Sequence, residues 1–254
     1  MLLKYRKALF SLLRPQLWPA LANGVAASIE HHAALADRPF KSIIDVGANR
    51  GQFVLFARMI NRDATIVAFE PLEAPRRVCE RLFARDPRVI IKDVAIGASQ
   101  HGALMFVAAK DDSSSLLAVG GVQHEVFGTT AQQTSPVQVR RLEDCIAAED
   151  LASPALLKID VQGGELDVLR GAESLLNGFA AIYVECSYVP LYEGQALASD
   201  VIAFLAQRGF SIAGVFNQHE HWRFGPVQAD FLFVRTERPE PTVTAGLRSN
   251  AVAA

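Results

Sequence analysis

The sequence predicts an α/β fold built around one mostly parallel β-sheet, and three observations lead to that prediction. Short apolar runs alternate with helical patterns over residues 40–235, which is typical of βαβ units. Several of these runs end in an acidic residue, and a glycine-rich turn follows the first of them in "KSIIDVGANRGQF". Because no linker rich in Pro, Gly or Ser divides the 254 residues, we expect a single domain with small additions.

The first half of this domain contains two strand–helix units and a third strand. We expect strands at 42–46, 64–69 and 88–94, with helices at 51–61 and 72–85. The alternation then breaks, because "GALMFVAAK" and "SPVQVRRL" both have strand patterns and enclose a polar stretch, 111–135. Two extra strands joined by a loop are therefore predicted.

The alternation returns in the second half. The predicted helices are 142–149, 164–177 and 197–208, and the predicted strands are 155–160, 180–186, 210–216 and 229–235. Since only a loop, 217–228, joins the last two strands, we expect them to form an antiparallel pair at one edge. The tail 236–254 is rich in Pro, Thr and Ala and is predicted to be disordered.

Residues 1–39 are predicted to form a helical extension. Basic residues break its apolar runs and Pro15 and Pro19 interrupt them again, so it lacks the roughly 20 apolar residues of a membrane span. Two interpretations stay open. A helix that packs on the domain or a partner chain is favoured, because such stretches are more often packing faces. The alternative is an amphipathic helix over 1–14 that contacts an anionic membrane surface.

Composition limits the partners and the compartment. With 25 basic and 27 acidic residues the net charge is −2, so nucleic acid is not expected as a main partner. Cys79, Cys145 and Cys186 lie far apart and form no CxxC pair, which predicts neither disulfides nor a zinc site. We therefore expect a cytoplasmic protein, with peripheral membrane contact left open.

The glycine-rich turn and a second strand end predict a cofactor site. Asp45 ends the first strand, and Gly47 and Gly51 would let the backbone approach a ligand closely. This turn alone is equally compatible with packing. The second strand, however, ends in Glu70-Pro71, and an acid at that position can accept both hydroxyls of a ribose. The pair predicts a cofactor that contains adenosine.

Two such cofactors were weighed. A dinucleotide site prefers G-x-G-x-x-G, but Asn49 occupies the middle position, and no phosphate-binding G-x-x-x-x-G-K-[ST] loop is present. S-adenosylmethionine has no phosphate and carries a sulfonium and an ammonium, which an acidic strand end suits better. An NAD-dependent oxidoreductase and a cofactor-free scaffold or membrane-surface protein stay as alternatives.

The sequence resembles FkbM-type methyltransferases over roughly residues 40–235. The motifs "DVGANRGQF", "FEP", "KDVAIGAS", "DDSSS", "RRLEDC" and "LLKIDVQGGELDVLRGAESLL" occur in the family's order. The resemblance implies the seven-stranded Rossmann-like class I methyltransferase fold, with strand order reversing between the first and fourth strands. It also implies O-methylation, dependent on S-adenosylmethionine, of a sugar or glycan, a glycolipid or a secondary metabolite.

Asp160 and Glu185 end the fourth and fifth strands, so we expect both carboxylates at the same sheet edge as Asp45 and Glu70. Either Asp160 or Glu185 could take up the proton that the substrate hydroxyl loses when it is methylated. Together they could also hold a divalent metal that lowers the acceptor's pKa, but no third oxygen ligand stands beside them, so catalysis without a metal is favoured. The resemblance places 93–95 beside the adenine and favours a site role for the serine run. The full predicted cofactor set is Asp45, Gly47, Ala48, Asn49, Gly51, Glu70, Pro71, Asp93, Val94, Ala95 and Ser114.

Gln162 stands where the family often has an acid, which would leave the proton to Asp160, Glu165 or Glu185. We expect Glu165 to complete the first turn of a helix and Lys158 to be structural. The expected partner is a small-molecule or glycan acceptor, and homo-oligomer formation is left open. Further expectations are solvated loop positions for His219 and His221, and a place beside the acceptor pocket for Trp222 and for the segment from Tyr188 to Tyr192.

Overall fold

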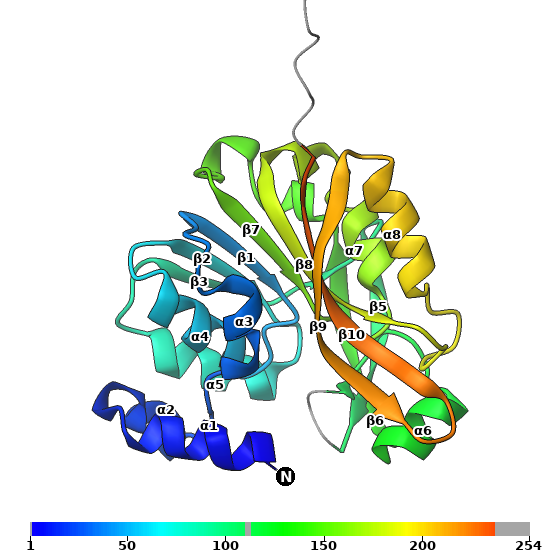
Figure 1. The fold of residues 1–254 in the computed structure, drawn as a ribbon, viewed down its shortest axis with the longest axis horizontal. Coiled ribbons are helices and arrows are strands. Elements are labelled where there is room, and N and C mark those ends of the chain that lie inside the picture. Colours follow the sequence, from blue (N-terminus) through cyan, green and yellow to red (C-terminus); the bar gives the residue numbers. More distant parts are fainter. Residues whose placement is uncertain (1, 110–112, 237–254) are drawn as a thin grey trace, which may run out of the picture.

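The computed structural model describes residues 2–109 and 113–236, and the predicted disordered tail lies outside this part except for Thr236 (Figure 1). Five short helical elements lie within residues 2–35 and precede the first strand. They are α1 (Leu2–Leu12), η1 (Pro15–Leu17), α2 (Trp18–Ala22), η2 (Ile29–His31) and α3 (His32–Leu35). Ser11 and Leu17 are buried, so one side of this segment packs against the rest of the protein.

The main sheet has seven strands in the order β3-β2-β1-β7-β8-β10-β9. β1, β2, β3, β7 and β8 pair in parallel, whereas β10 is antiparallel to both β8 and β9. The predicted mostly parallel sheet, its antiparallel edge pair and the reversal between the first and fourth strands are confirmed. The strands are β1 (Ser42–Val46), β2 (Thr65–Phe69), β3 (Val89–Lys92), β7 (Ala155–Ile159), β8 (Phe179–Ser187), β9 (Phe210–His221) and β10 (Gly225–Arg235).

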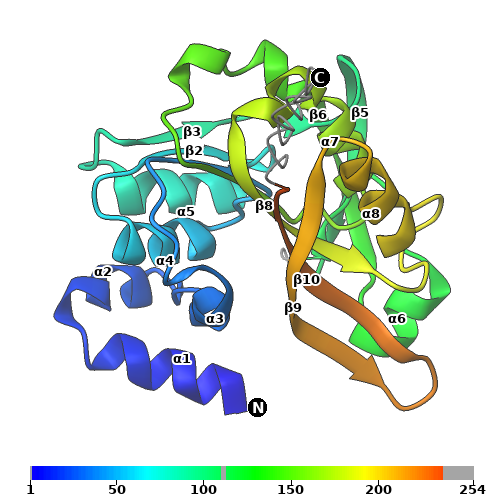
Figure 2. The same ribbon diagram turned by 45° about the horizontal axis from the view of Figure 1, so that its top comes forward.

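Helices cover both faces of this sheet (Figures 1 and 2). Side chains alternate along β1, so Ile43 belongs to one apolar cluster and Ile44 to the other. The Ile43 cluster includes side chains of α4 and α5, and the Ile44 cluster includes side chains of α7 and α8. These helices are α4 (Gln52–Ile60), α5 (Glu73–Phe83), α7 (Glu165–Arg170) and α8 (Ala198–Ala206).

The two predicted extra strands form a separate small sheet, but the segment between them is not a simple loop. The order is β4-β6-β5, with β4 (Ala95–Ile96), β5 (His101–Ala108) and β6 (Ala131–Arg140). The segment contains α6 (Gly121–Phe127), which the sequence analysis missed. Gly128 ends α6 at φ +66°, a left-handed conformation typical of a residue just after a helix.

The predicted helix 142–149 is wrong, since the chain forms two short 3₁₀ turns, η4 (Leu142–Asp144) and η5 (Ala148–Asp150). The buried side chains of Leu142 and Ile146 are four residues apart, which imitates a helical pattern. The Glu143 N–H instead donates to the Gly171 carbonyl at 3.2 Å. Tertiary contacts therefore override the local pattern.

Two further predicted boundaries differ. The helix predicted over 164–177 divides into α7 and η6 (Glu173–Gly178), because Gly171 packs directly on the Gly97 carbonyl. The predicted loop 217–228 is mostly strand, since β9 and β10 extend as a hairpin whose turn spans only 222–224. The polar side chains of this hairpin are largely exposed, which explains their loop-like sequence.

We predict that Gly47→Ala destabilises the protein more than Gly194→Ala, because a steric clash adds to the backbone strain only at Gly47. Gly47 has φ +86°, and a Cβ there would lie 1.8 Å from the Asp160 carbonyl oxygen. Strain and overpacking together should lower the free energy of unfolding by about 2–4 kcal/mol. Gly194→Ala, at φ +73° with nothing within 4 Å, is the matched control and should lose about 1 kcal/mol. Equal losses in urea melts would contradict the predicted tight contact between the ends of β1 and β7.

Candidate active site

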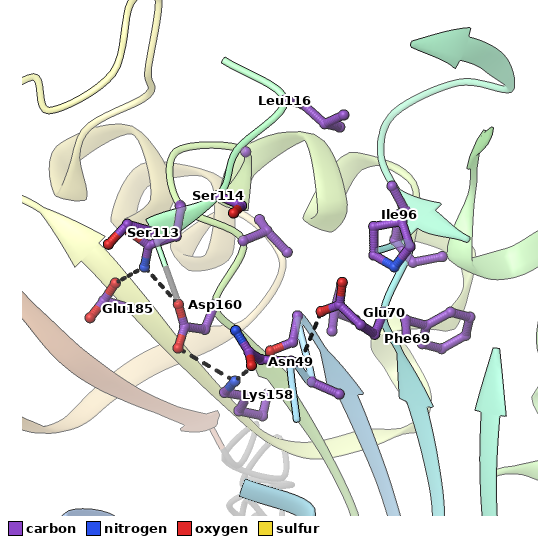
Figure 3. Close-up of a pocket in the computed structure, with 18 of the residues that line it drawn as sticks. Asn49, Phe69, Glu70, Ile96, Ser113, Ser114, Leu116, Lys158, Asp160 and Glu185 are labelled. Carbon is purple, nitrogen blue, oxygen red and sulfur yellow. Dashed lines mark hydrogen bonds and ion pairs between the residues drawn. The ribbon is translucent and has the colours of Figure 1, made fainter. Parts of the chain in front are cut away.

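A cavity of about 680 Å³ opens at the carboxyl ends of β1, β2, β7 and β8, where the strand order reverses (Figure 3). Its volume is within the ~300–1,000 Å³ typical of small-molecule sites. Residues from the small sheet, the β9–β10 hairpin, η2 and α1 complete its walls. In open α/β sheets the crevice at this reversal is the usual ligand site.

A buried ion pair lies beneath the cavity, between β1 and β7. Asp45 and Lys158 are register partners, and Lys158 Nζ lies 3.1 Å from Asp45 Oδ1 and 3.5 Å from Asp160 Oδ2. Burial opposes the charge of Lys158, but the two carboxylates raise its pKa above the ordinary value. Asp45, which the sequence analysis expected to contact the cofactor, is fully buried and does not line the cavity. Its carboxylate faces a neighbouring strand instead.

Glu70 lines the cavity at the end of β2, as predicted, together with Gly47, Ala48, Asn49 and Pro71. Its carboxylate accepts hydrogen bonds from the backbone N–H groups of Asn49 at 2.9 Å and Leu72 at 2.8 Å. Burial raises the pKa of Glu70 to about 7. Carboxylate oxygens have spare lone pairs, so Glu70 can also accept hydroxyl donors from a ligand.

Two predicted cofactor residues lie outside the cavity. Gly51 lies against α5, where an added Cβ would meet Cys79 Sγ at 2.7 Å, so this glycine is needed for packing at φ +87°. Asp93 is exposed just beyond β3 and does not line the cavity. The predicted Val94, Ala95 and Ser114 do line it.

The end of the cavity near Val94 and Ala95 is largely apolar. Ile96, Met105 and Leu116 also line it, and Figure 3 shows Ile96, Leu116 and Phe69 on the Glu70 side of the site. Ser114 Oγ accepts the Ala108 N–H at 3.1 Å, which fixes the serine turn over this wall. The residues therefore fit S-adenosylmethionine, with an apolar slot for adenine, a carboxylate for ribose, and Asn49 and Asp160 beside its charged part.

Asp160 and Glu185, the predicted catalytic pair, line the cavity on neighbouring strands (Figure 3). Gln162 joins them, because its Nε2 donates to Asp160 Oδ1 at 2.9 Å and to Glu185 Oε2 at 2.8 Å. Tyr192 donates its hydroxyl to Gln162 Oε1 at 2.9 Å, which orients the amide. Gln228 donates to the other Glu185 oxygen at 2.7 Å.

Burial raises the pKa of Glu185 well above its ordinary value, and the negative charges of Asp160, Asp230 and Glu165 act in the same direction. Glu165 itself accepts the Gly163 N–H at 2.9 Å at the start of α7 and does not line the cavity. This geometry agrees with the predicted role of Glu165 at the helix start. Burial also raises the pKa of Glu165, to about 7.

A polar group beyond Glu185 was missed by the sequence analysis. Asp230 is the register partner of Glu185, so both side chains lie on one sheet face. Asp230 Oδ2 accepts hydrogen bonds from Tyr183 at 2.9 Å and Asn217 at 2.7 Å, and His31 Nδ1 lies 3.4 Å away. We call the cavity wall formed by His31, Glu185, Asn217, Gln228 and Asp230 the polar end.

Of the residues expected beside the acceptor pocket, Tyr192 contacts the site through Gln162, whereas Trp222 and Tyr188 lie away from the cavity. Trp222 is 88% exposed in the hairpin turn, and Tyr188 does not line the cavity. His219 and His221 lie on β9, not in a loop. Within residues 2–109 and 113–236, no group of three or more His, Cys, Asp or Glu side chains is arranged to hold a metal ion.

This fold and site define a class I methyltransferase. The family described as "Methyltransferase FkbM domain" matches residues 45–212. The chain therefore belongs to the FkbM methyltransferase family, is a methyltransferase, and uses S-adenosylmethionine as its methyl donor. Family membership rules out the oxidoreductase alternative.

Curated relatives agree with this membership. The chain is 28% identical over 170 residues to "2-O-methyltransferase NoeI" of Sinorhizobium fredii, covering 64% of this chain and 70% of that protein. It is 28% identical over 198 residues to "31-O-demethyl-FK506 methyltransferase FkbM" of Streptomyces tacrolimicus, covering 69% and 74%. Among solved structures, magnesium protoporphyrin IX methyltransferase of Synechocystis is similar at a TM-score of 0.42 and 12% identity, with 87% of this chain and 79% of that chain covered.

We predict that Glu70→Gln lowers the affinity for S-adenosylhomocysteine about 10- to 100-fold, because charge-assisted hydrogen bonds to the ribose are lost. In the unchanged protein the affinity should increase as pH rises through about 7, since only the ionised carboxylate accepts both hydroxyls. Calorimetry from pH 5.5 to 8.5 measures both effects. Exposed Glu149→Gln is the control, and an unchanged affinity in Glu70→Gln would remove Glu70 from the ribose site.

Proposed function

We propose that this methyltransferase methylates a hydroxyl oxygen of a glycan, a glycolipid or a secondary metabolite. The observation that carries the proposal is Glu185, a half-buried carboxylate beside Asp160 on the wall of the cavity that also contains Glu70. A neutral hydroxyl must lose its proton when its oxygen is methylated, and a carboxylate with a raised pKa is a suitable acceptor. Both curated relatives have names that specify O-methylation, which supports this choice.

S-adenosylmethionine supplies an electrophilic methyl group when it is bound. The role of the chain is then to orient the acceptor and to receive a proton. Glu70 would hold the ribose, and Asn49 and Asp160 would lie near the charged methionine part. Glu185 would accept the hydroxyl proton on a carboxylate oxygen.

Glu185 is a better proton acceptor than Asp160 for an electrostatic reason. Asp160 Oδ2 lies 3.5 Å from the Lys158 ammonium, so this carboxylate already has a cationic partner. Within the described part of the chain Glu185 forms no ion pair with Lys or Arg, and its two oxygens accept only amide donors. Its neighbouring carboxylates raise its pKa, which increases its affinity for a proton.

The polar end supports an acceptor that carries several hydroxyls. Carboxylates at Glu185 and Asp230 accept hydroxyl donors, and the amides of Asn217 and Gln228 can both donate and accept. A sugar ring presents donors and acceptors at short intervals, which such a wall can pair. This chemistry favours a glycan or glycolipid over an apolar metabolite.

The test uses radiolabelled S-adenosylmethionine with a panel of methyl glycosides, a glycolipid extract and hydroxylated polyketides. We expect a labelled methyl ether with at least one hydroxyl acceptor, identified by NMR of the product. Calorimetry with S-adenosylhomocysteine confirms that the sample binds the cofactor. Transfer only to nitrogen or carbon would contradict the proposal.

With the acceptor found, Glu185→Gln should lower kcat by about 10²–10⁴-fold, because the proton acceptor is lost, without changing S-adenosylhomocysteine affinity.

The rate of the unchanged enzyme should rise with pH as Glu185 ionises, at a midpoint above the ordinary 4.5. Asp160→Asn should move that midpoint to lower pH, since one of the charges that raises the Glu185 pKa is gone. Exposed Glu193→Gln should match the unchanged enzyme. If the rise of the rate with pH disappeared in Asp160→Asn but persisted in Glu185→Gln, Asp160 would be the base and the proposed role of Glu185 would be contradicted.

A further inference from the structure

Helix α1 has an inner and an outer side. On the inner side, Lys7 Nζ lies 2.6 Å from Glu30 Oε1 and Ser11 is buried. On the outer side, Leu9, Leu12 and Leu13 are 59%, 60% and 70% exposed. Their spacing of three and four residues places them in one stripe. The favoured prediction of a packing helix therefore accounts for only one side of α1.

A tryptophan extends this stripe. Trp18 is 54% exposed, and its indole N–H donates to the Leu12 carbonyl at 3.1 Å, so the ring lies beside Leu12. We call Leu9, Leu12, Leu13 and Trp18 the outer face. Single exposed apolar residues are ordinary, but four large ones within ten residues of chain are typical of an interaction surface.

The segment that carries the outer face is rich in positive charge, and of its four basic residues Lys7 is paired with Glu30 on the inner side. Residues 1–29 contain Lys4, Arg6, Lys7 and Arg14, four of the 25 basic residues of the chain, and none of its 27 acidic residues. This excess of positive charge stands out in a chain whose net charge is −2. Exposed leucines with a Trp and basic neighbours match the boundary between lipid headgroups and acyl chains, where anionic lipids supply the opposite charge. No helix in residues 2–109 and 113–236 is long and apolar enough to cross a membrane, so such contact would be peripheral.

The inner side of α1 borders the active-site cavity. Lys7 of α1 lines that cavity, and a second groove is lined by Arg6, Phe10, Glu30 and Asn217. Figures 1 and 2 both place α1 and the β9–β10 turn at the same end of the molecule, and exposed Trp222 is in that turn. A surface that contacts the outer face would therefore be separated from the cavity by the width of one helix, about 10 Å.

We propose that the outer face of α1 docks on an anionic membrane surface. Docking brings the polar end of the cavity close to the lipid headgroups. The choice of acceptor rests on the proposed function, which requires a hydroxyl. Because a cavity close to the headgroups can receive a hydroxyl of a membrane lipid, docking favours the glycolipid among the three acceptor classes. The docking itself does not depend on catalysis.

Vesicle co-sedimentation of the full chain tests the proposal. The vesicles are phosphatidylcholine alone or mixed with phosphatidylglycerol. We expect binding to the anionic vesicles that weakens with salt. The triple variant Leu9→Ser, Leu12→Ser, Leu13→Ser should bind about tenfold or more weakly, because the apolar contact is removed. Leu104→Ser, Ile212→Ser, Val215→Ser removes three other exposed apolar side chains and should bind like the unchanged protein.

The proposal would be overturned if the unchanged protein bound neither kind of vesicle, or if the triple variant bound as well as the unchanged protein. It would also be overturned if the unchanged protein bound no vesicles but formed a dimer, detected by light scattering, that the triple variant could not form. Circular dichroism verifies that each variant is folded. S-adenosylhomocysteine affinity is measured on the same samples and should be equal in all of them. Loss of vesicle binding with intact cofactor binding separates failure of the docking proposal from failure of the proposed function.

Discussion

The ammonium group of Lys158, buried between two carboxylates, is the interaction on which the site depends. Asp45 is wholly buried in β1 and needs a counter-charge, and Lys158 on β7 provides it at 3.1 Å. The same ammonium contacts Asp160, which follows β7 and is bridged through Gln162 to Glu185 on β8. One buried cation therefore links β1, β7 and β8 at the point where the strand order of the sheet reverses. The missing Cβ of Gly47 lets the Asp160 backbone approach this point closely.

Backbone strain is concentrated around the same cavity. Within the described part of the chain, Asn49, Gln162 and Asn217 are the non-glycine residues with positive φ, and all three line the cavity. Left-handed conformations cost about 1–2 kcal/mol each, and such strain is common at functional sites. Each residue also makes a specific contact there: the Asn49 N–H with Glu70, the Gln162 amide with the two acids, and the Asn217 amide with Asp230. The surrounding sheet holds these conformations in place.

The sequence predicted the sheet and the acids at its edge better than it predicted which way each side chain faces. Glu70, Asp160 and Glu185 could be found because parallel strands bring their carboxyl ends to one edge. Asp45 has the same sequence pattern, but its carboxylate turns to Lys158, and only cross-strand register decides that difference. His31 and Asp230 were missed because they reach the cavity from the N-terminal extension and from an antiparallel strand, which no local pattern connects with the site.

A double-mutant cycle on Asp45 and Lys158 tests the central claim most directly, with the free energy of unfolding measured in urea. Lys158→Met leaves the buried Asp45 charge unpaired and should lower that free energy by about 3–5 kcal/mol. Asp45→Asn leaves Lys158 with Asp160 as its remaining partner, so its loss should be smaller. The double variant should lose much less than the two losses together, because neither charge remains. Additive losses would show that the two groups do not depend on each other and would contradict the account.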